Sequence, residues 1–184
     1  MPELFRRLEE IETGIIVPKP EIVRMVTEAI AESGYTAVEI DDERQWGAYF
    51  RLDNDQANPF IEEFFPDLNP SEARGGNPDV ELTPKILLVA PGQRLSWQYH
   101  NRRAEIWRFL TEGSYNRSMD YEQGDAIPAH SGEMVEFGQA ERHRLNGLLA
   151  SYSLVAEIWR HTDPSNPSDE SDIIRLADDY NRAV

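Results

Sequence analysis

The sequence predicts a mainly β protein, a double-sheet jelly-roll barrel with an N-terminal helical extension and a C-terminal helical segment. From residue 80 onward, short apolar or alternating runs recur between turn-forming Gly, Pro, Asn and Asp residues. Such a pattern is typical of an all-β sandwich or barrel, and a double-sheet jelly roll fits it. A single amphipathic helical pattern precedes these runs.

The extension begins without a clear period over residues 1–17 and then becomes helical. Pro20 lies at the start of an apolar stripe and Gly34 at its end, the positions that these two residues favour around a helix. We expect this helix to pack against the barrel or against a second subunit. The stripe consists of Ile22, Val23, Met25, Val26, Ala29 and Ile30.

The remaining elements are expected in order along the chain. Residues 58–65 predict either a short helix or an ordered aromatic loop, and 72–79 a polar surface loop. Residues 162–171 predict a flexible excursion, with a lid as one possibility. A helical segment then carries Arg175 and Arg182, which are seven residues apart and so share one helical face. The expected strands are 35–40, 47–52, 85–90, 94–100, 105–110, 115–121, 134–137, 142–146 and 152–161.

One stretch predicts a metal site. In a strand, Gln98 and His100 are two residues apart and point to the same face. Residues 101–104 are polar and predict a hairpin loop, which would place His100 opposite Glu105 on the returning strand. An imidazole, a carboxylate and an amide oxygen suit a divalent cation such as Mn, Fe, Co, Ni or Zn. His143 is expected to complete the set.

These residues stand in a frame that resembles the two motifs of the cupin superfamily. The first motif is represented by Gly92, by Gln98 in place of its first His, by His100 and Glu105, and by Gly113 one residue late. The second begins at Gly132 and places His143 in register, although Gly138 and Ala140 replace its Pro and Gly and Asn146 comes one residue early. The resemblance implies a cupin barrel.

Two other histidines compete with His143 as the fourth ligand. The segment that ends at His130 lacks the glycine and the spacing of the second motif. His161 stands at the edge of a loop, where we expect a surface residue or a contact to substrate. His143 is therefore the preferred ligand.

Within the cupins, the sequence resembles type II phosphomannose isomerases. PGQRLSWQYH at 91–100 and RAEIW at 103–107 are similar to the family's PGQxLSLQxH and RxEHW. QWGAY at 45–49 resembles its RPWGxY, and DIIRLADDYNR at 172–182 its DDIVRLEDDYGR. The resemblance covers roughly 44 to 182, so we expect an extension with its amphipathic helix at 1–43 and a cupin barrel domain at 44–184. The family's His after the metal-site Glu is Ile106 here.

The resemblance implies conversion of mannose 6-phosphate to fructose 6-phosphate with one divalent ion (Zn, Mn, Co, Ni or Fe), in a homodimer. The proton between C1 and C2 would be moved by a carboxylate, for which strand parity favours Glu157. Arg103, Arg175 and Arg182 would anchor the phosphate. The alternatives are a phosphosugar- or sugar-nucleotide-binding cupin without turnover, and a metal-dependent cupin dioxygenase, for which two His and one carboxylate also suffice.

Composition limits the partners. A net charge of −16 argues against nucleic acid and anionic membranes, which the protein would repel. Lys19 and Lys85 are the only lysines among the 18 basic residues, and arginine binds phosphate bidentately. The chain contains no Cys, its first residues lack the apolar core of a signal peptide, and no apolar run is long enough for a membrane span. We therefore expect a cytoplasmic protein, and the resemblance to the isomerases implies a small-molecule phosphosugar substrate.

Overall fold

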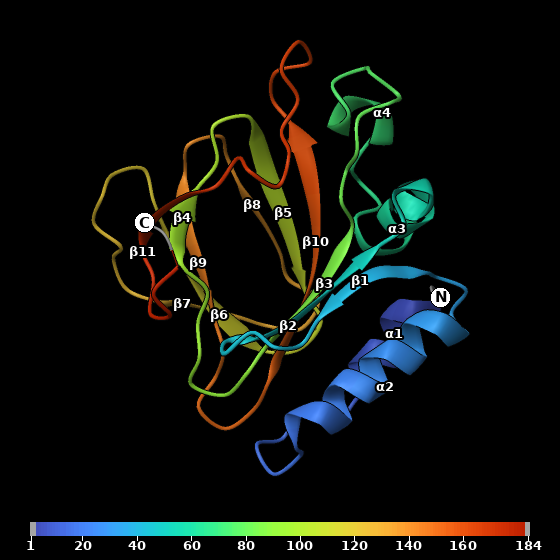
Figure 1. Cartoon of the computed structure of the whole chain (residues 1–184), viewed down its shortest axis with the longest axis vertical. Coiled ribbons are helices and arrows are strands. Elements are labelled where there is room, and N and C mark those ends of the chain that lie inside the picture. Colours follow the sequence, from blue (N-terminus) through green and yellow to red (C-terminus); the bar gives the residue numbers. More distant parts are fainter. Residues whose placement is uncertain (1–2, 183–184) are drawn as a thin grey trace.

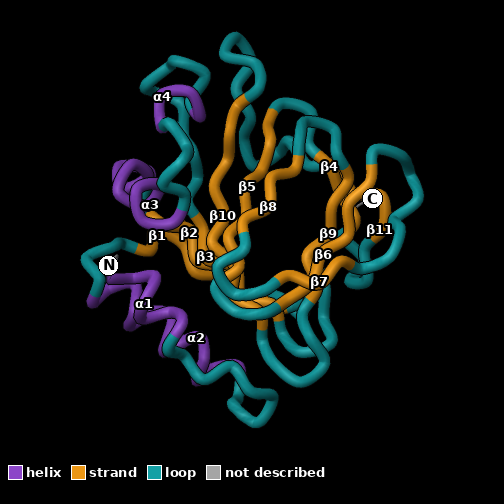
Figure 2. Tube along the Cα trace, turned by 180° about the vertical axis from the view of Figure 1, so that it is seen from behind, coloured by secondary structure: helices purple, strands orange, loops and turns teal. Residues whose placement is uncertain are grey.

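The computed structural model describes residues 3–182 and contains two antiparallel sheets that face each other (Figure 1). One sheet has six strands in the order β1-β2-β3-β10-β5-β8, and the other has five in the order β11-β4-β9-β6-β7. Viewed from behind, the two sheets curve around a common interior (Figure 2). The strands are β1 (Ala37–Asp41), β2 (Gly47–Leu52), β3 (Lys85–Val89), β4 (Trp97–Tyr99), β5 (Arg103–Phe109), β6 (Gly113–Ser118), β7 (Ile127–Ala129), β8 (Met134–Phe137), β9 (Arg142–Asn146), β10 (Ser153–His161) and β11 (Ile174–Ala177).

The predicted jelly-roll architecture is confirmed, and each of the nine expected strands has a counterpart. The predicted C-terminal helical segment is wrong, because Ile174–Ala177 forms strand β11. This segment pairs antiparallel with β4, and Arg175 lies opposite Gln98. Its backbone groups therefore form hydrogen bonds with β4 at the edge of the sheet instead of within a helix. Strand β7 also has no counterpart among the expected elements.

The helices cover the outer face of the six-stranded sheet (Figure 1). The expected helix is confirmed as α2 (Lys19–Glu32), and residues 58–65 fall largely within a helix, α3 (Ala57–Phe64). The remaining helices are α1 (Glu3–Glu9), α4 (Pro70–Ala73) and a 3₁₀ turn at Asn54–Gln56. Helix α1 was not anticipated from residues 1–17. None of the helices of residues 3–182 is long and apolar enough to cross a membrane.

Strand β10 separates two hydrophobic clusters. Leu154, Ala156 and Ile158 face outward into a cluster with α1, α2 and α3. Val155 faces inward, where an aromatic cluster that includes Trp107 and Phe137 fills the barrel. Strand β1, from the expected extension, pairs with β2 of the barrel. Residues before and after the division expected at residue 43 therefore belong to the same sheet and the same hydrophobic cluster.

Candidate metal centre and adjoining cavity

Three buried side chains meet inside the barrel. Their potential ligand atoms all lie within 4.8 Å of one another. The His100 Nε2 atom is 3.0 Å from Glu105 Oε1, and the His143 Nε2 atom is 3.3 Å from Glu105 Oε2. His100 follows β4 and His143 lies on β9, both in the five-stranded sheet, whereas Glu105 comes from β5 in the opposite sheet.

Both imidazoles are oriented by backbone carbonyls. His100 Nδ1 lies 2.5 Å from the carbonyl oxygen of Asp172, and His143 Nδ1 lies 3.0 Å from that of Glu141. A carbonyl only accepts, so each Nδ1 carries the proton, and a neutral ring then presents its Nε2 lone pair to Glu105. Burial lowers the pKa of His100, which favours the neutral ring. Metal-binding histidines are commonly held in this way.

The electrostatics of the cluster fit a cation. Burial alone would raise the pKa of Glu105, but the charge of His100 when its ring is protonated, together with that of Arg103, outweighs burial and holds that pKa well below its usual range. Arg103 donates to Glu105 Oε1 from Nε at 3.0 Å and from Nη2 at 2.9 Å. Among residues 3–182, neither Glu105 Oε2 nor His143 Nε2 has a hydrogen-bond partner. Buried acceptors that face each other without a donor are costly, and a divalent ion bound by two imidazoles and a carboxylate would satisfy them.

The expected route to this convergence is wrong. His100 and Glu105 are not neighbours in a hairpin, because β4 pairs with β11 and β9, while β5 pairs with β10 and β8. After β4 the chain crosses from one sheet to the other, and the two side chains meet across the barrel interior. The prediction that His100 and Glu105 lie close together is therefore confirmed, but the predicted pairing of their two strands in one hairpin is wrong.

Gln98 also faces the interior. It pairs with His143 in the β4–β9 ladder and lines the cavity beside Glu105. Its Oε1 atom accepts a hydrogen bond from Ser96 Oγ. Gln98 thus stands next to the three-residue cluster, and its role as a ligand remains a proposal.

The two rival histidines are placed elsewhere. The His130 side chain is 77% exposed, 3.7 Å from a carboxylate oxygen of Glu112. His161 is buried, and both its ring nitrogens are engaged, Nε2 with the Glu81 carbonyl at 2.7 Å and Nδ1 with the Ser168 N–H at 3.0 Å. The expectation of a surface or substrate-contacting His161 is therefore wrong, because this ring fastens the loop that follows β10.

A cavity opens beside the cluster. Its interior volume is about 180 Å³, and its mouth is open to solvent. Its wall carries five basic side chains and three carboxylates, although the protein as a whole has a net charge of −16. The lining residues that bear charge are Arg44, Lys85, Arg103, Arg175, Arg182, Glu105, Glu157 and Glu170.

Glu157 faces this cavity, as strand parity predicted. Its Oε2 atom accepts a hydrogen bond from Trp107 Nε1 at 3.1 Å, and its Oε1 atom lies 3.8 Å from Lys85 Nζ. Burial and the charge of Glu105 raise the pKa of Glu157 to about 7, against the opposing charges of Lys85 and Arg103. A carboxyl group with such a pKa can both accept and return a proton near neutral pH.

The three arginines predicted to anchor phosphate have different surroundings. Arg103 is fully engaged, since besides Glu105 it contacts Ser168 and two backbone carbonyls of the loop after β10 and stacks 3.9 Å above the Trp159 ring. Arg182 is paired with Asp178. The Arg175 guanidinium has no hydrogen-bond or ion-pair partner within residues 3–182, and its Nε atom is buried. Burial and the charge of Arg182 lower the pKa of Arg175.

Ile106 points away from the cavity. Alternation along β5 directs Glu105 and Trp107 inward and Ile106 outward, into the cluster that the helices cover. The residue that replaces the expected His therefore cannot contact a ligand in the barrel. Two neighbours of the site were not anticipated, Lys85 at the cavity wall and Asp172, which orients His100. Asp172 begins the segment that resembled the isomerases, the one sequence signal that pointed to it.

Comparison with known proteins supports the fold. No family model and no curated protein matches the sequence. Among solved structures, the capsular polysaccharide assembling protein CapF from Staphylococcus aureus is similar over 85% of this chain and 35% of its own length, with a TM-score of 0.50 and 12% identity. A mutant of oxalate decarboxylase OxdC from Bacillus subtilis gives a TM-score of 0.48 at 12% identity over 72% of this chain and 29% of its own.

A predicted oxalate decarboxylase from Thermotoga maritima gives a TM-score of 0.45 at 15% identity over 70% of this chain and 95% of its own. The chain spans about a third of the length of CapF. The molecule therefore has the jelly-roll fold of the cupins, with a buried His-Glu-His group in its barrel.

Proposed function

We propose that this protein is a metal-dependent aldose–ketose isomerase that converts mannose 6-phosphate to fructose 6-phosphate. The observation that carries the proposal is the position of Glu157. A buried carboxyl group with a pKa of about 7 shares one cavity with Glu105 of the metal cluster and with the unpaired Arg175. Acid–base chemistry, a cation site and an anion site are thus combined within one small space.

His100, Glu105 and His143 would hold the ion, with Gln98 as the proposed further ligand. A bound divalent ion would polarise the substrate's carbonyl and hydroxyl oxygens and stabilise the negative charge of an enediolate. Arg103 holds the Glu105 carboxylate in place from the loop side. The N–H groups of Arg103 are already used in hydrogen bonds within the protein. We therefore propose that Arg103 positions Glu105 and does not bind the phosphate.

Glu157 would move the proton. Isomerisation requires a base to take a proton from C2 of the aldose and return it to C1, which a single carboxylate can do. The Trp107 N–H donates a hydrogen bond to Oε2 of Glu157. The other oxygen, Oε1, lies on the side of Lys85 and accepts no hydrogen bond from Trp107. The pKa of about 7 keeps a substantial fraction of Glu157 ionised at neutral pH.

The phosphate would bind to Arg175, with Arg182 beside it. Arg175 has no acidic partner among the described residues, so its guanidinium is free to bind an oxyanion bidentately. Concentrating positive charge in one cavity lets an acidic protein bind an anionic substrate. A phosphosugar fits this charge distribution better than a neutral sugar does.

Glu157→Gln separates catalysis from binding. The amide keeps the size of the side chain and the acceptor for Trp107 but cannot take a proton. We expect kcat for mannose 6-phosphate to fall at least about 100-fold while fructose 6-phosphate still binds. Full activity in this variant would remove Glu157 from the mechanism. If the unaltered protein binds the sugar phosphate without converting it, it is a sugar-phosphate-binding cupin, and oxygen uptake with the Fe(II)-loaded protein would indicate a dioxygenase.

A further inference from the structure

Lys85 is one of the residues that line the cavity. It projects from β3, is 8% exposed, and its Nζ atom lies 4.8 Å above the Trp159 ring. Nζ is 2.8 Å from Glu170 Oε1 and 3.8 Å from Glu157 Oε1. The ammonium is thus held mainly by Glu170, and a buried ammonium needs such a partner.

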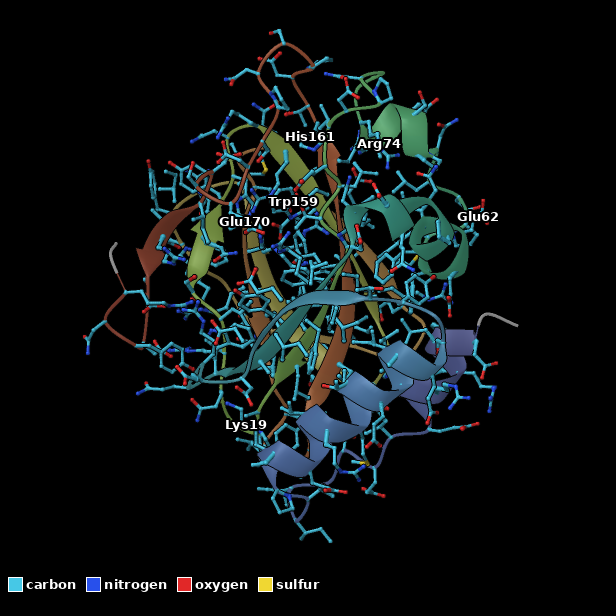
Figure 3. The ribbon with its side chains drawn as sticks, turned by 45° about the vertical axis from the view of Figure 1, so that its right-hand side comes forward. Lys19, Glu62, Arg74, Trp159, His161 and Glu170 are labelled. Carbon is cyan, nitrogen blue, oxygen red and sulfur yellow. The ribbon has the colours of Figure 1, made fainter. Side chains whose placement is uncertain are left out.

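Glu170 is a partner of a different kind. It lies on the loop between β10 and β11, and its side chain is 61% exposed although it contributes to the cavity wall. Figure 3 shows Glu170 on that loop and Trp159 inside the barrel. If Glu170 leaves Lys85, water can solvate its carboxylate. The free-energy cost of this exchange is small, because ion pairs with an exposed partner contribute little to stability. Lys85 is buried and cannot make the same exchange.

We propose that Lys85 is a ligand-binding residue of the cavity and that the Glu170 carboxylate occupies the place of a ligand oxyanion, which displaces it on binding. The ligand chemistry is that of a phosphate group, as in the sugar phosphate of the proposed function, on which this inference rests. Lys85 and Arg175 line the same cavity. Lys85 then keeps an anionic partner throughout, and the exposed Glu170 returns to solvent.

The alternative is that Lys85 and Glu170 form a purely structural ion pair. The two cases differ in what Glu170→Gln does to anion binding. If the carboxylate competes with the ligand, removing its charge strengthens binding of inorganic phosphate about two- to fivefold, the range expected for a half-exposed ion pair. If the pair is only structural, Glu170→Gln leaves phosphate binding unchanged.

The experiment is calorimetric titration of inorganic phosphate into the metal-loaded protein at constant ionic strength. Lys85→Met should weaken binding at least about tenfold, and Glu170→Gln should give no gain in the Lys85→Met background, because the competition needs the ammonium. Glu62→Gln is the matched control, since it removes one exposed negative charge from α3, away from Glu170 (Figure 3). It should bind phosphate as the unaltered protein does.

Arg175→Gln separates failure of this inference from failure of the proposed function. If phosphate binding is lost in Arg175→Gln but unchanged in Glu170→Gln and in Lys85→Met, the cavity is an anion site and the inference about Lys85 is overturned. If the unaltered protein and Glu170→Gln both fail to bind phosphate, the anion site itself, and with it the proposed function, is overturned.

Discussion

Replacing Glu157 with Gln should stabilise the protein at alkaline pH and not at acid pH. Glu157 has an ordinary pKa of 4.5 in the unfolded chain and a pKa of about 7 in the folded protein, raised by burial and by the charge of Glu105. The folded state therefore binds this proton more tightly. As pH rises from about 4.5 to about 7, the carboxyl group ionises more readily in the unfolded state, and the free energy of unfolding falls.

The magnitude follows from the two pKa values. At about 1.4 kcal/mol per pKa unit, the change from 4.5 to about 7 corresponds to about 3 kcal/mol of stability, present below pH 4.5 and lost above pH 7. Gln does not ionise and keeps the acceptor for Trp107, so the Glu157→Gln variant escapes this loss. The free energy of unfolding of the variant minus that of the unaltered protein should therefore be up to about 3 kcal/mol larger at pH 8 than at pH 5.

The assay is urea unfolding of the metal-stripped proteins, followed by Trp fluorescence at pH 5 and pH 8. Removing metal avoids the additional charge beside Glu105. Other groups titrate in both proteins, so the difference between variant and parent isolates position 157. A stability difference that is the same at both pH values would refute the assignment of a raised pKa to Glu157.

Three further outcomes are expected. His143→Ala should weaken Mn or Zn binding at least about 100-fold while His130→Ala leaves it unchanged, which equilibrium dialysis would show; equal losses would contradict the ligand set. Asp172→Ala should weaken metal binding about 10- to 100-fold, and Asp172→Asn should weaken it less. The reason is that the Asp172 carboxylate accepts hydrogen bonds from two backbone N–H groups and so holds in place the Asp172 carbonyl that orients His100. Metal titrations of both variants that match the parent would contradict this. Activity should rise with pH as Glu157 ionises, with a midpoint at or below about 7 because a bound ion offsets the charge of Glu105. Arg175→Gln should raise KM for mannose 6-phosphate more than it lowers kcat.

The barrel strands were predictable because their signal is local. Alternation along residues 152–161 correctly separated the inward Glu157 from the outward Leu154 and Ile158. Residue spacing also brought His100 and Glu105 together. The pairing that achieves this was not predictable, because contact across a barrel depends on which sheet each strand joins, and a short loop does not encode that choice.

The C-terminal segment shows where local patterns fail. Arg175 and Arg182, seven residues apart, fit one face of a helix, but residues 174–177 instead complete the edge of β4. Tertiary pairing overrides propensity in so short a segment. Both arginines still line the same cavity, which the strand achieves by a different geometry. Helix α1 was missed although Leu4, Phe5, Leu8 and Ile11 follow helical spacing, because this pattern extends over only two turns.

We propose a metal-dependent isomerisation centred on the His-Glu-His group. The most direct measurement is a coupled assay of mannose 6-phosphate conversion to fructose 6-phosphate after Mn, Co, Zn, Ni or Fe is returned to metal-stripped protein. We expect turnover that requires the ion and that His100→Ala abolishes while the protein remains folded. Absence of turnover with every metal, in a folded protein shown to bind the ion, would contradict the claim.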